Sequence, residues 1–178
     1  MTLVPGQTEA QRAKLQNCAA QAPFGRLGFG RVKMFTDGVF GTWTAFRTDD
    51  YPDRPGFRSA PLFTPTEFAK VCATADARGL QIATHAVDDV AVRATLDGYQ
   101  AAAAANAPRD SRHRLEHIDM IRPEDLPRLV ALGVAASMQP VHPPGLAGLP
   151  LAPNVTIMAQ NRWGDTFPWR PFTGLACR

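Results

Sequence analysis

The most informative segment for the fold is residues 80–118, LQIATHAVDDVAVRATLDGYQAAAAANAPRDSRHRLEHI. It opens with a short apolar run that ends at His85 and continues with a helical pattern over about 88–105. A second short run with apolar positions then ends at His117. A strand, a helix and a second strand in this order predict a β–α–β unit, in which the two strands are parallel.

The same alternation extends outward from this stretch. Short runs at 29–35 and 134–139 predict two more strands, and helical patterns cover about 64–79 and 123–133. Strands that alternate with helices predict an α/β fold with a parallel sheet, either part of a TIM (β/α)8 barrel or an open doubly wound sheet. The chain has 178 residues, fewer than the roughly 250 of a complete barrel, so a barrel interpretation implies a partial barrel.

Composition and charge exclude several classes of protein. Hydrophobic residues make up 45% and charged residues 20%, a balance typical of a globular chain. The net charge is +3, but the arginines are scattered among acidic residues, so we expect no nucleic-acid partner. No apolar run is long enough to span a membrane and the first residues do not resemble a signal peptide, so we expect a cytoplasmic protein. Cys18, Cys72 and Cys177 are too far apart to suggest a disulfide framework or a cysteine zinc site.

Three residues of metal-ligand type follow the predicted strands. His85 and His117 end two of them, and Lys33 lies within a third, between apolar neighbours. A single histidine at a strand end is more often structural, but two in equivalent positions favour a shared metal site, because imidazole is a common ligand. A buried lysine has a lowered pKa and can react with carbon dioxide to give a carbamate, an anionic oxygen ligand.

Five other residues are weaker candidates for orienting the ligands or touching a substrate. Asp37 and Asp89 follow two of these strands, although a turn and a helix start explain them equally well. Strict alternation along 112–118 places His113 on the same face as His117 and Glu116 on the other. The remaining candidates, in or beside a proline-rich loop, are Gln139 and His142.

Five segments carry a resemblance to a known family. They are VKMFTDGVFGTWTA (32–45), YPDRPG (51–56), QIATHAVDDVAV (81–92), RHRLEHID (112–119) and GVAASMQPVHPPG (133–145). In sequence and order they resemble the YtcJ-like amidohydrolases, to which N-substituted formamide deformylases are also similar. The resemblance implies that residues 1–178 form one partial barrel domain that covers about strands 4 to 7.

The resemblance also implies roles for the candidate ligands. Lys33 corresponds to a carboxylated lysine that bridges two metal ions, and His85 and His117 correspond to ligands of the second metal. The implied cofactor is one or two divalent ions, with zinc the expected metal. Asp88 is a departure, because the family usually has glycine at this place in the turn after His85.

Two family elements do not occur in this sequence. The histidines are at 85, 113, 117 and 142, so there is no His-x-His pair of the kind found on the family's first strand. The catalytic aspartate of the eighth strand has no counterpart either, because the segment around Asp165 resembles the helix before that strand. We therefore expect an internal fragment with no identifiable catalytic residue.

The function implied for the intact parent is metal-dependent hydrolysis of a non-peptide, amide-type carbon–nitrogen bond in a small molecule. We expect the chain alone to be inactive and to self-associate through exposed barrel edges. Two alternatives stay open: a phosphoesterase-like metal-dependent barrel hydrolase and a non-enzymatic truncated product.

Overall fold

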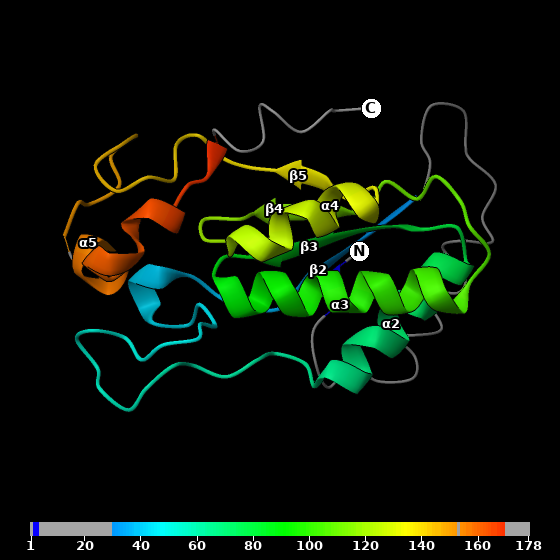
Figure 1. Ribbon diagram of the computed structural model, residues 1–178, viewed down its shortest axis with the longest axis horizontal. Coiled ribbons are helices and arrows are strands. Elements are labelled where there is room, and N and C mark those ends of the chain that lie inside the picture. Colours follow the sequence, from blue (N-terminus) through cyan, green and yellow to red (C-terminus); the bar gives the residue numbers. More distant parts are fainter. Residues whose placement is uncertain (1, 4–29, 153, 170–178) are drawn as a thin grey trace.

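A five-stranded parallel sheet forms the centre of the molecule. The computed structural model describes residues 2–3, 30–152 and 154–169. The strands lie side by side in the order in which they occur in the chain, β1-β2-β3-β4-β5, and every neighbouring pair is parallel (Figure 1). They are β1 (Thr2–Leu3), β2 (Arg31–Phe35), β3 (Gln81–Ala86), β4 (Arg114–His117) and β5 (Ala135–Ser137).

Three helices lie against one face of this sheet, as Figure 1 shows. They are α2 (Pro65–Ala77), α3 (Asp89–Ala105) and α4 (Leu126–Ala131), the last preceded by a 3-10 turn, η2 (Pro123–Asp125). The helix starts follow from local chemistry. Thr64 and Glu67 form a complete capping box at the start of α2, with proline at the first helical position, and Asp88 caps α3.

The α/β class, the parallel sheet and the four predicted strands are confirmed. Each of these strands is found within two residues of its predicted limits, except that Phe29 lies outside the described residues. The short β1 was not predicted, because two residues carry no periodicity.

The main core fills the space between the sheet and the helices. Val32 and Met34 of β2, Ile82 of β3 and Leu115 of β4 all point into it and are almost completely buried. Alternation along β2 and β3 therefore leaves Lys33 and His85 on the opposite face.

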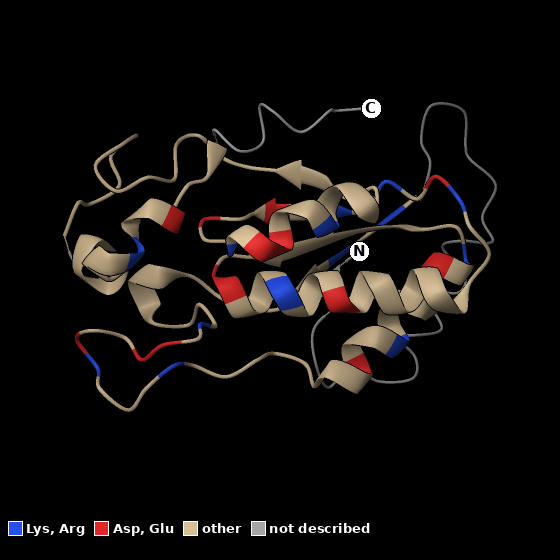
Figure 2. Cartoon of the chain, in the orientation of Figure 1, with Lys and Arg blue, Asp and Glu red and all other residues tan. Residues whose placement is uncertain are grey.

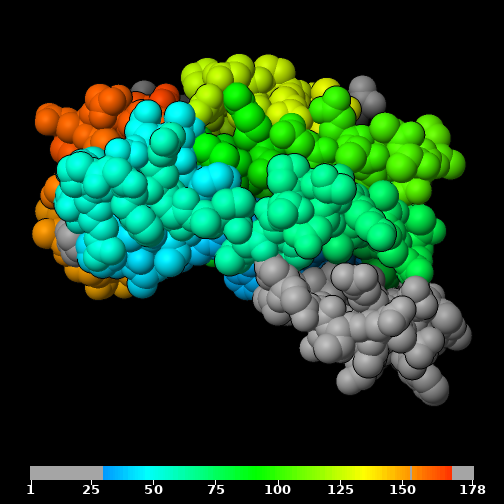
Figure 3. Space-filling model, turned by 90° about the horizontal axis from the view of Figure 1, so that it is seen from below, coloured from blue at the N-terminus to red at the C-terminus, as the bar shows by residue number. Residues whose placement is uncertain are grey.

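A second apolar cluster lies beyond the carboxyl ends of the strands. It joins the segment 37–63, which contains the 3-10 turn η1 (Phe40–Thr42), to α5 (Asn154–Ile157), and the 3-10 turn η3 (Gln160–Asp165) follows. Figure 3 shows the 37–63 segment beside the last described part of the chain. Arg47 crosses this junction, fully buried, and donates a 2.6 Å hydrogen bond to the carbonyl of Ile157.

Charged residues of both signs are intermixed over the described elements (Figure 2). Within the part of the chain that the structure describes, no helix combines the length and apolar character needed to cross a membrane.

Candidate metal centre

Lys33 and His85 lie on adjacent strands, on the face of the sheet that the described helices leave uncovered. Phe35 pairs with His85 in the β2–β3 register, and its ring is near both side chains. The Lys33 ammonium is 5.2 Å from the centre of the Phe35 ring, and that ring is 4.9 Å from the His85 imidazole. The strand geometry thus brings the two predicted ligands to one face of the sheet, each beside the Phe35 ring.

His117 joins the same cluster through an irregular end to β4. Its ring centre is 4.3 Å from that of His85, in an edge-to-face arrangement. Its φ is +79° and that of Ile118 is +53°, conformations that side chains other than glycine rarely adopt. This turn moves His117 onto the face of Glu116 and sends Ile118 into the main core.

The prediction from strict alternation was therefore wrong for β4. Leu115 points into the core, and Glu116 pairs with Arg114 at 2.6 Å on the other face. There the charge of Glu116 partly opposes the effect of burial, which lowers the pKa of Lys33. His113 lies on the helix side and does not join the cluster. The alternation fails because His117 and Ile118, both with positive φ, interrupt the extended backbone at the carboxyl end of the strand.

The cluster favours uncharged ligands. Burial, together with the neighbouring His85 and His142, lowers the pKa of His117 to about 4. Burial also lowers the pKa of His85 and of Lys33. A neutral imidazole can bind a metal ion, and a neutral amine can react with carbon dioxide.

Asp37 and Gly38 fix the orientation of His85. The Nε2 atom of His85 donates to the Gly38 carbonyl at 2.8 Å, which leaves Nδ1 with its lone pair. Asp37 accepts hydrogen bonds from three backbone amides, those of Phe46, Val87 and Asp88, and its carboxylate is 3.7 Å from Nε2 of His85. Burial raises the pKa of Asp37 to about 8, although the three amides act in the opposite direction. Gly38 tolerates no side chain, because a Cβ there would collide with Thr44.

Polar atoms near His117 lack partners within the protein. Nδ1 of His117 and Oε1 of Gln139 are both buried without a hydrogen bond of good geometry, although the Gln139 side chain lies close enough to His117 to oppose the lowering of its pKa. Such orphaned atoms are uncommon in folded proteins and often mark a place where an ion or ligand binds. Two imidazoles beside a lysine therefore fit part of a metal site. Within residues 2–3, 30–152 and 154–169, no group of three or more His, Cys, Asp or Glu residues is arranged to hold a metal ion.

A model of the "Amidohydrolase family" matches residues 6–173, almost the whole chain. The chain belongs to the amidohydrolase family. Two solved structures support this: uncharacterized metal-dependent hydrolases from Pyrococcus furiosus and Pyrococcus horikoshii OT3, with TM-scores of 0.75 and 0.77 and 25% identity to each. The similarity covers 92% and 94% of this chain, but 33% and 32% of those chains.

Curated relatives are similar over a shorter range. "Protein LONG AFTER FAR-RED 3" of Arabidopsis thaliana is 38% identical over 116 residues, which are 65% of this chain and 20% of that protein. "Putative amidohydrolase YtcJ" of Bacillus subtilis is 28% identical over 113 residues, 63% of this chain and 21% of that protein. This amidohydrolase chain therefore spans about a fifth of the length of the curated relatives that it matches.

The remaining candidates have different positions in this amidohydrolase. Asp89 is fully buried and binds Thr48, Arg122 and Arg162, so it ties three loops together. Asp88, the departure from the family pattern, is the buried partner of Arg47, at 3.7 Å. Asp165 ends the 3-10 turn η3 and pairs with Arg162 at 3.4 Å.

His142 lies closer to the cluster than its loop position suggests. Its ring stacks on that of His117, with 5.0 Å between centres and 10° between planes. Its Nδ1 atom is 3.2 Å from the carboxylate of Asp119, a residue that the sequence reasoning missed. Asp119 follows His117 by two positions at the carboxyl end of β4, and that position is the signal that could have identified it.

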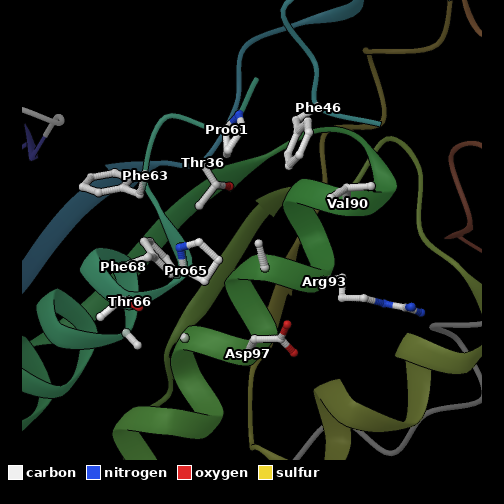
Figure 4. Close-up of a pocket in the computed structure, with 13 residues that line it drawn as sticks. Thr36, Phe46, Pro61, Phe63, Pro65, Thr66, Phe68, Val90, Arg93 and Asp97 are labelled. Carbon is white, nitrogen blue, oxygen red and sulfur yellow. The ribbon is translucent and has the colours of Figure 1, made fainter. Parts of the chain in front are cut away.

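A hollow of about 700 Å³ lies on the other side of the sheet. It is formed mainly by apolar side chains of α2, α3 and the segment before α2, including Phe46, Phe63 and Phe68 (Figure 4). Its lining contains none of the candidate ligands.

Proposed function

We propose that this chain contributes Lys33, His85 and His117 to the metal centre of a hydrolase that cleaves amide-type, non-peptide carbon–nitrogen bonds in small molecules. The observation that carries the proposal is the contact between the His85 and His117 rings, with Nδ1 of His117 buried and without a hydrogen bond, on the face of the sheet that also carries Lys33. Membership of the amidohydrolase family and the similarity to metal-dependent hydrolases support it.

Each residue has a distinct part in this proposal. His85, held through Nε2 by Gly38, offers Nδ1 as a donor. His117 offers a neutral ring, because its pKa of about 4 keeps it uncharged at physiological pH. Asp37 and the backbone that it binds hold the turn around His85 in place. A divalent cation at this place, zinc by preference, would act as a Lewis acid that polarises a substrate carbonyl and makes water a better nucleophile.

Lys33 is proposed to be carboxylated. Its half-buried position lowers its pKa and raises the fraction of neutral amine, which can add to carbon dioxide with loss of a proton. The nearby Glu116 opposes this by stabilising the ammonium form. We therefore propose that the carbamate persists only where a bound cation balances its charge. Mass spectrometry of the metal-loaded protein under native conditions should show the additional carboxyl group, and Lys33→Ala should remove it.

The sheet is proposed to be part of a (β/α)8 barrel. Consecutive strand order, parallel pairing and helices on one face all support a barrel over a doubly wound sheet, which has helices on both faces. Further ligands and the general base are proposed to come from residues outside this chain. The chain alone should then bind metal weakly and lack turnover.

The exposed strand edge suggests a further property of the isolated chain. Within the described residues β5 pairs only with β4, so its outer edge is open to another strand. Open edges favour pairing with other chains. We propose that the isolated chain self-associates, and a concentration-independent monomer in analytical ultracentrifugation would contradict this.

The experiment compares this chain with the full-length protein that carries it. Both are titrated with zinc by calorimetry and assayed with N-acyl amines and with phosphotriesters. Metal-dependent hydrolysis of the N-acyl amines by the full-length protein, with none by this chain, is the expected result. Preference for the phosphotriesters would instead indicate a phosphoesterase. Tight zinc binding with turnover in this chain would show that the site needs no residues from outside it.

A further inference from the structure

An aspartate–histidine pair lies next to the proposed metal ligands and has no part in holding the metal in the proposal above. Nδ1 of His142 is 3.2 Å from one carboxylate oxygen of Asp119 and 3.4 Å from the other. The His142 ring also stacks on His117. The pair therefore packs directly against a proposed metal ligand through the His142 ring.

Two separate parts of the chain hold this pair together. Asp119 lies just beyond β4, where its carbonyl accepts a hydrogen bond from the Phe167 amide at 2.7 Å. His142 lies in the loop after β5, in a turn closed by its own amide, which donates to the Gln139 carbonyl at 3.0 Å. The side chain of Asp119 is 11% exposed and that of His142 is 29% exposed. The carboxylate is thus at the inner end of the pair and the imidazole at its more open end.

The pairing determines which ring nitrogen can accept a hydrogen bond. An ionised carboxylate only accepts, so with Asp119 ionised Nδ1 of His142 carries the hydrogen and donates it to Asp119. Nε2 of a neutral His142 then holds a lone pair. The group that this atom recognises is a hydrogen-bond donor, such as the N–H of an amide.

We propose that His142 is a substrate-binding residue that accepts a hydrogen bond from the N–H of the scissile amide, and that Asp119 is the positioning residue that fixes its tautomer. This inference rests on the proposed function, and it narrows the substrate class. Amides that carry an N–H should be preferred over esters and over N-methylated amides, which have no hydrogen to donate. One neutral hydrogen bond corresponds to a preference of about 10-fold.

The first test needs no turnover. Long-range ¹H–¹⁵N spectra of the metal-free, full-length protein report the tautomer of each histidine ring. We expect His142 in the Nδ1–H form. In Asp119→Asn, which keeps the shape of the side chain, the amide can donate to Nδ1, so the Nε2–H form should increase, as the serine-protease precedent for this exchange shows. An Nε2–H ring in the unaltered protein would overturn the inference.

The second test compares two substrates, an N-acyl amine and its N-methylated analogue, with the metal-loaded full-length protein. His142→Ala and Asp119→Asn should each lower kcat/KM for the N–H substrate by about 10-fold and change that for the N-methylated analogue little. The matched control is Asp76→Asn, because Asp76 also pairs with a histidine, His113, but outside the metal cluster. It should leave the ratio between the two substrates unchanged.

The outcomes separate this inference from the proposed function. An active enzyme in which both substrates lose equally in His142→Ala would overturn the inference and leave the proposed function standing. A metal-loaded protein that hydrolyses neither substrate would overturn the proposed function, and with it the substrate role of His142. Zinc stoichiometry, measured for every variant, shows whether a loss arises from the metal instead.

Discussion

His113 immediately precedes β4 and His117 ends it, and both are buried or nearly so, yet their surroundings differ. Both ring nitrogens of His113 have partners: Nδ1 accepts from the Ile82 amide at 3.1 Å, and Nε2 is 3.2 Å from the Asp76 carboxylate. Nδ1 of His117 has none, and its ring packs against two other imidazoles.

The difference shows how a structural histidine is distinguished from a ligand. Burial lowers the pKa of both, so a lowered pKa does not separate them. The two histidines differ in whether other groups of the protein hydrogen-bond to their ring nitrogens. His113 connects β4, β3 and α2, whereas His117 retains an unused donor atom at the carboxyl end of the sheet, where barrel enzymes carry their active sites.

The largest expected effect is on metal affinity. In the full-length protein, His117→Ala should weaken zinc binding by more than about 100-fold, the upper range for loss of a residue that only supports a ligand. His113→Gln should change zinc affinity little, because His113 is on the other side of the sheet. Calorimetric titration of both variants measures this. Equal losses in the two variants would remove the distinction between the two histidines.

The second prediction concerns stability, where the larger loss is expected from the His113 variant. His113→Ala should lower the free energy of unfolding by about 2–3 kcal/mol, because it leaves the Ile82 amide and the buried Asp76 carboxylate without this partner. In the metal-free protein His117→Ala should have a smaller effect, since Nδ1 makes no hydrogen bond. Urea denaturation of both variants provides the measurement, and a larger loss in His117→Ala would contradict the account.

The third prediction uses pH. The folded-state pKa of His113 is lowered, mainly by burial and against the attraction of Asp76, so the unfolded chain binds its proton more readily. The contribution of His113 is therefore complete above the unfolded pKa of about 6.5 and is lost as the pH falls through the folded pKa. In His113→Gln the free energy of unfolding should fall less steeply below about pH 6.5. His85 and His117 are present in both proteins, so the difference between their curves of unfolding free energy against pH isolates His113. Parallel curves for the two proteins would contradict the prediction.

The smallest effect is expected far from either histidine. Thr64→Ala removes the hydrogen bond from the Glu67 amide that starts α2, the helix whose last turn presents Asp76 to His113. It should cost about 1 kcal/mol of stability without altering zinc affinity. Thermal unfolding and zinc titration together check this, and any loss of affinity would mean that α2 affects the metal centre.

Much of the fold could be predicted from the sequence. The runs that end at His85 and His117 and the capping box at Thr64 each report on local structure, so strands, helices and parallel pairing followed from them. The position of Lys33 and His85 on one face followed from the rule that side chains alternate along a strand.

The rest depended on features that a local pattern does not contain. The face of His117 is set by its positive φ, and the face of His113 by partners on two other elements. Asp119 and His142 are 23 residues apart and meet only because their loops follow adjacent strands. No periodicity in the sequence reports such a contact.

Anomalous diffraction at the zinc edge, from crystals of the full-length protein grown with zinc, shows whether His85 and His117 bind the metal. A peak is expected about 2.0–2.1 Å from a ring nitrogen of His85 and of His117. A zinc peak that contacts neither of these histidines, or one bound to His113, would contradict this expectation.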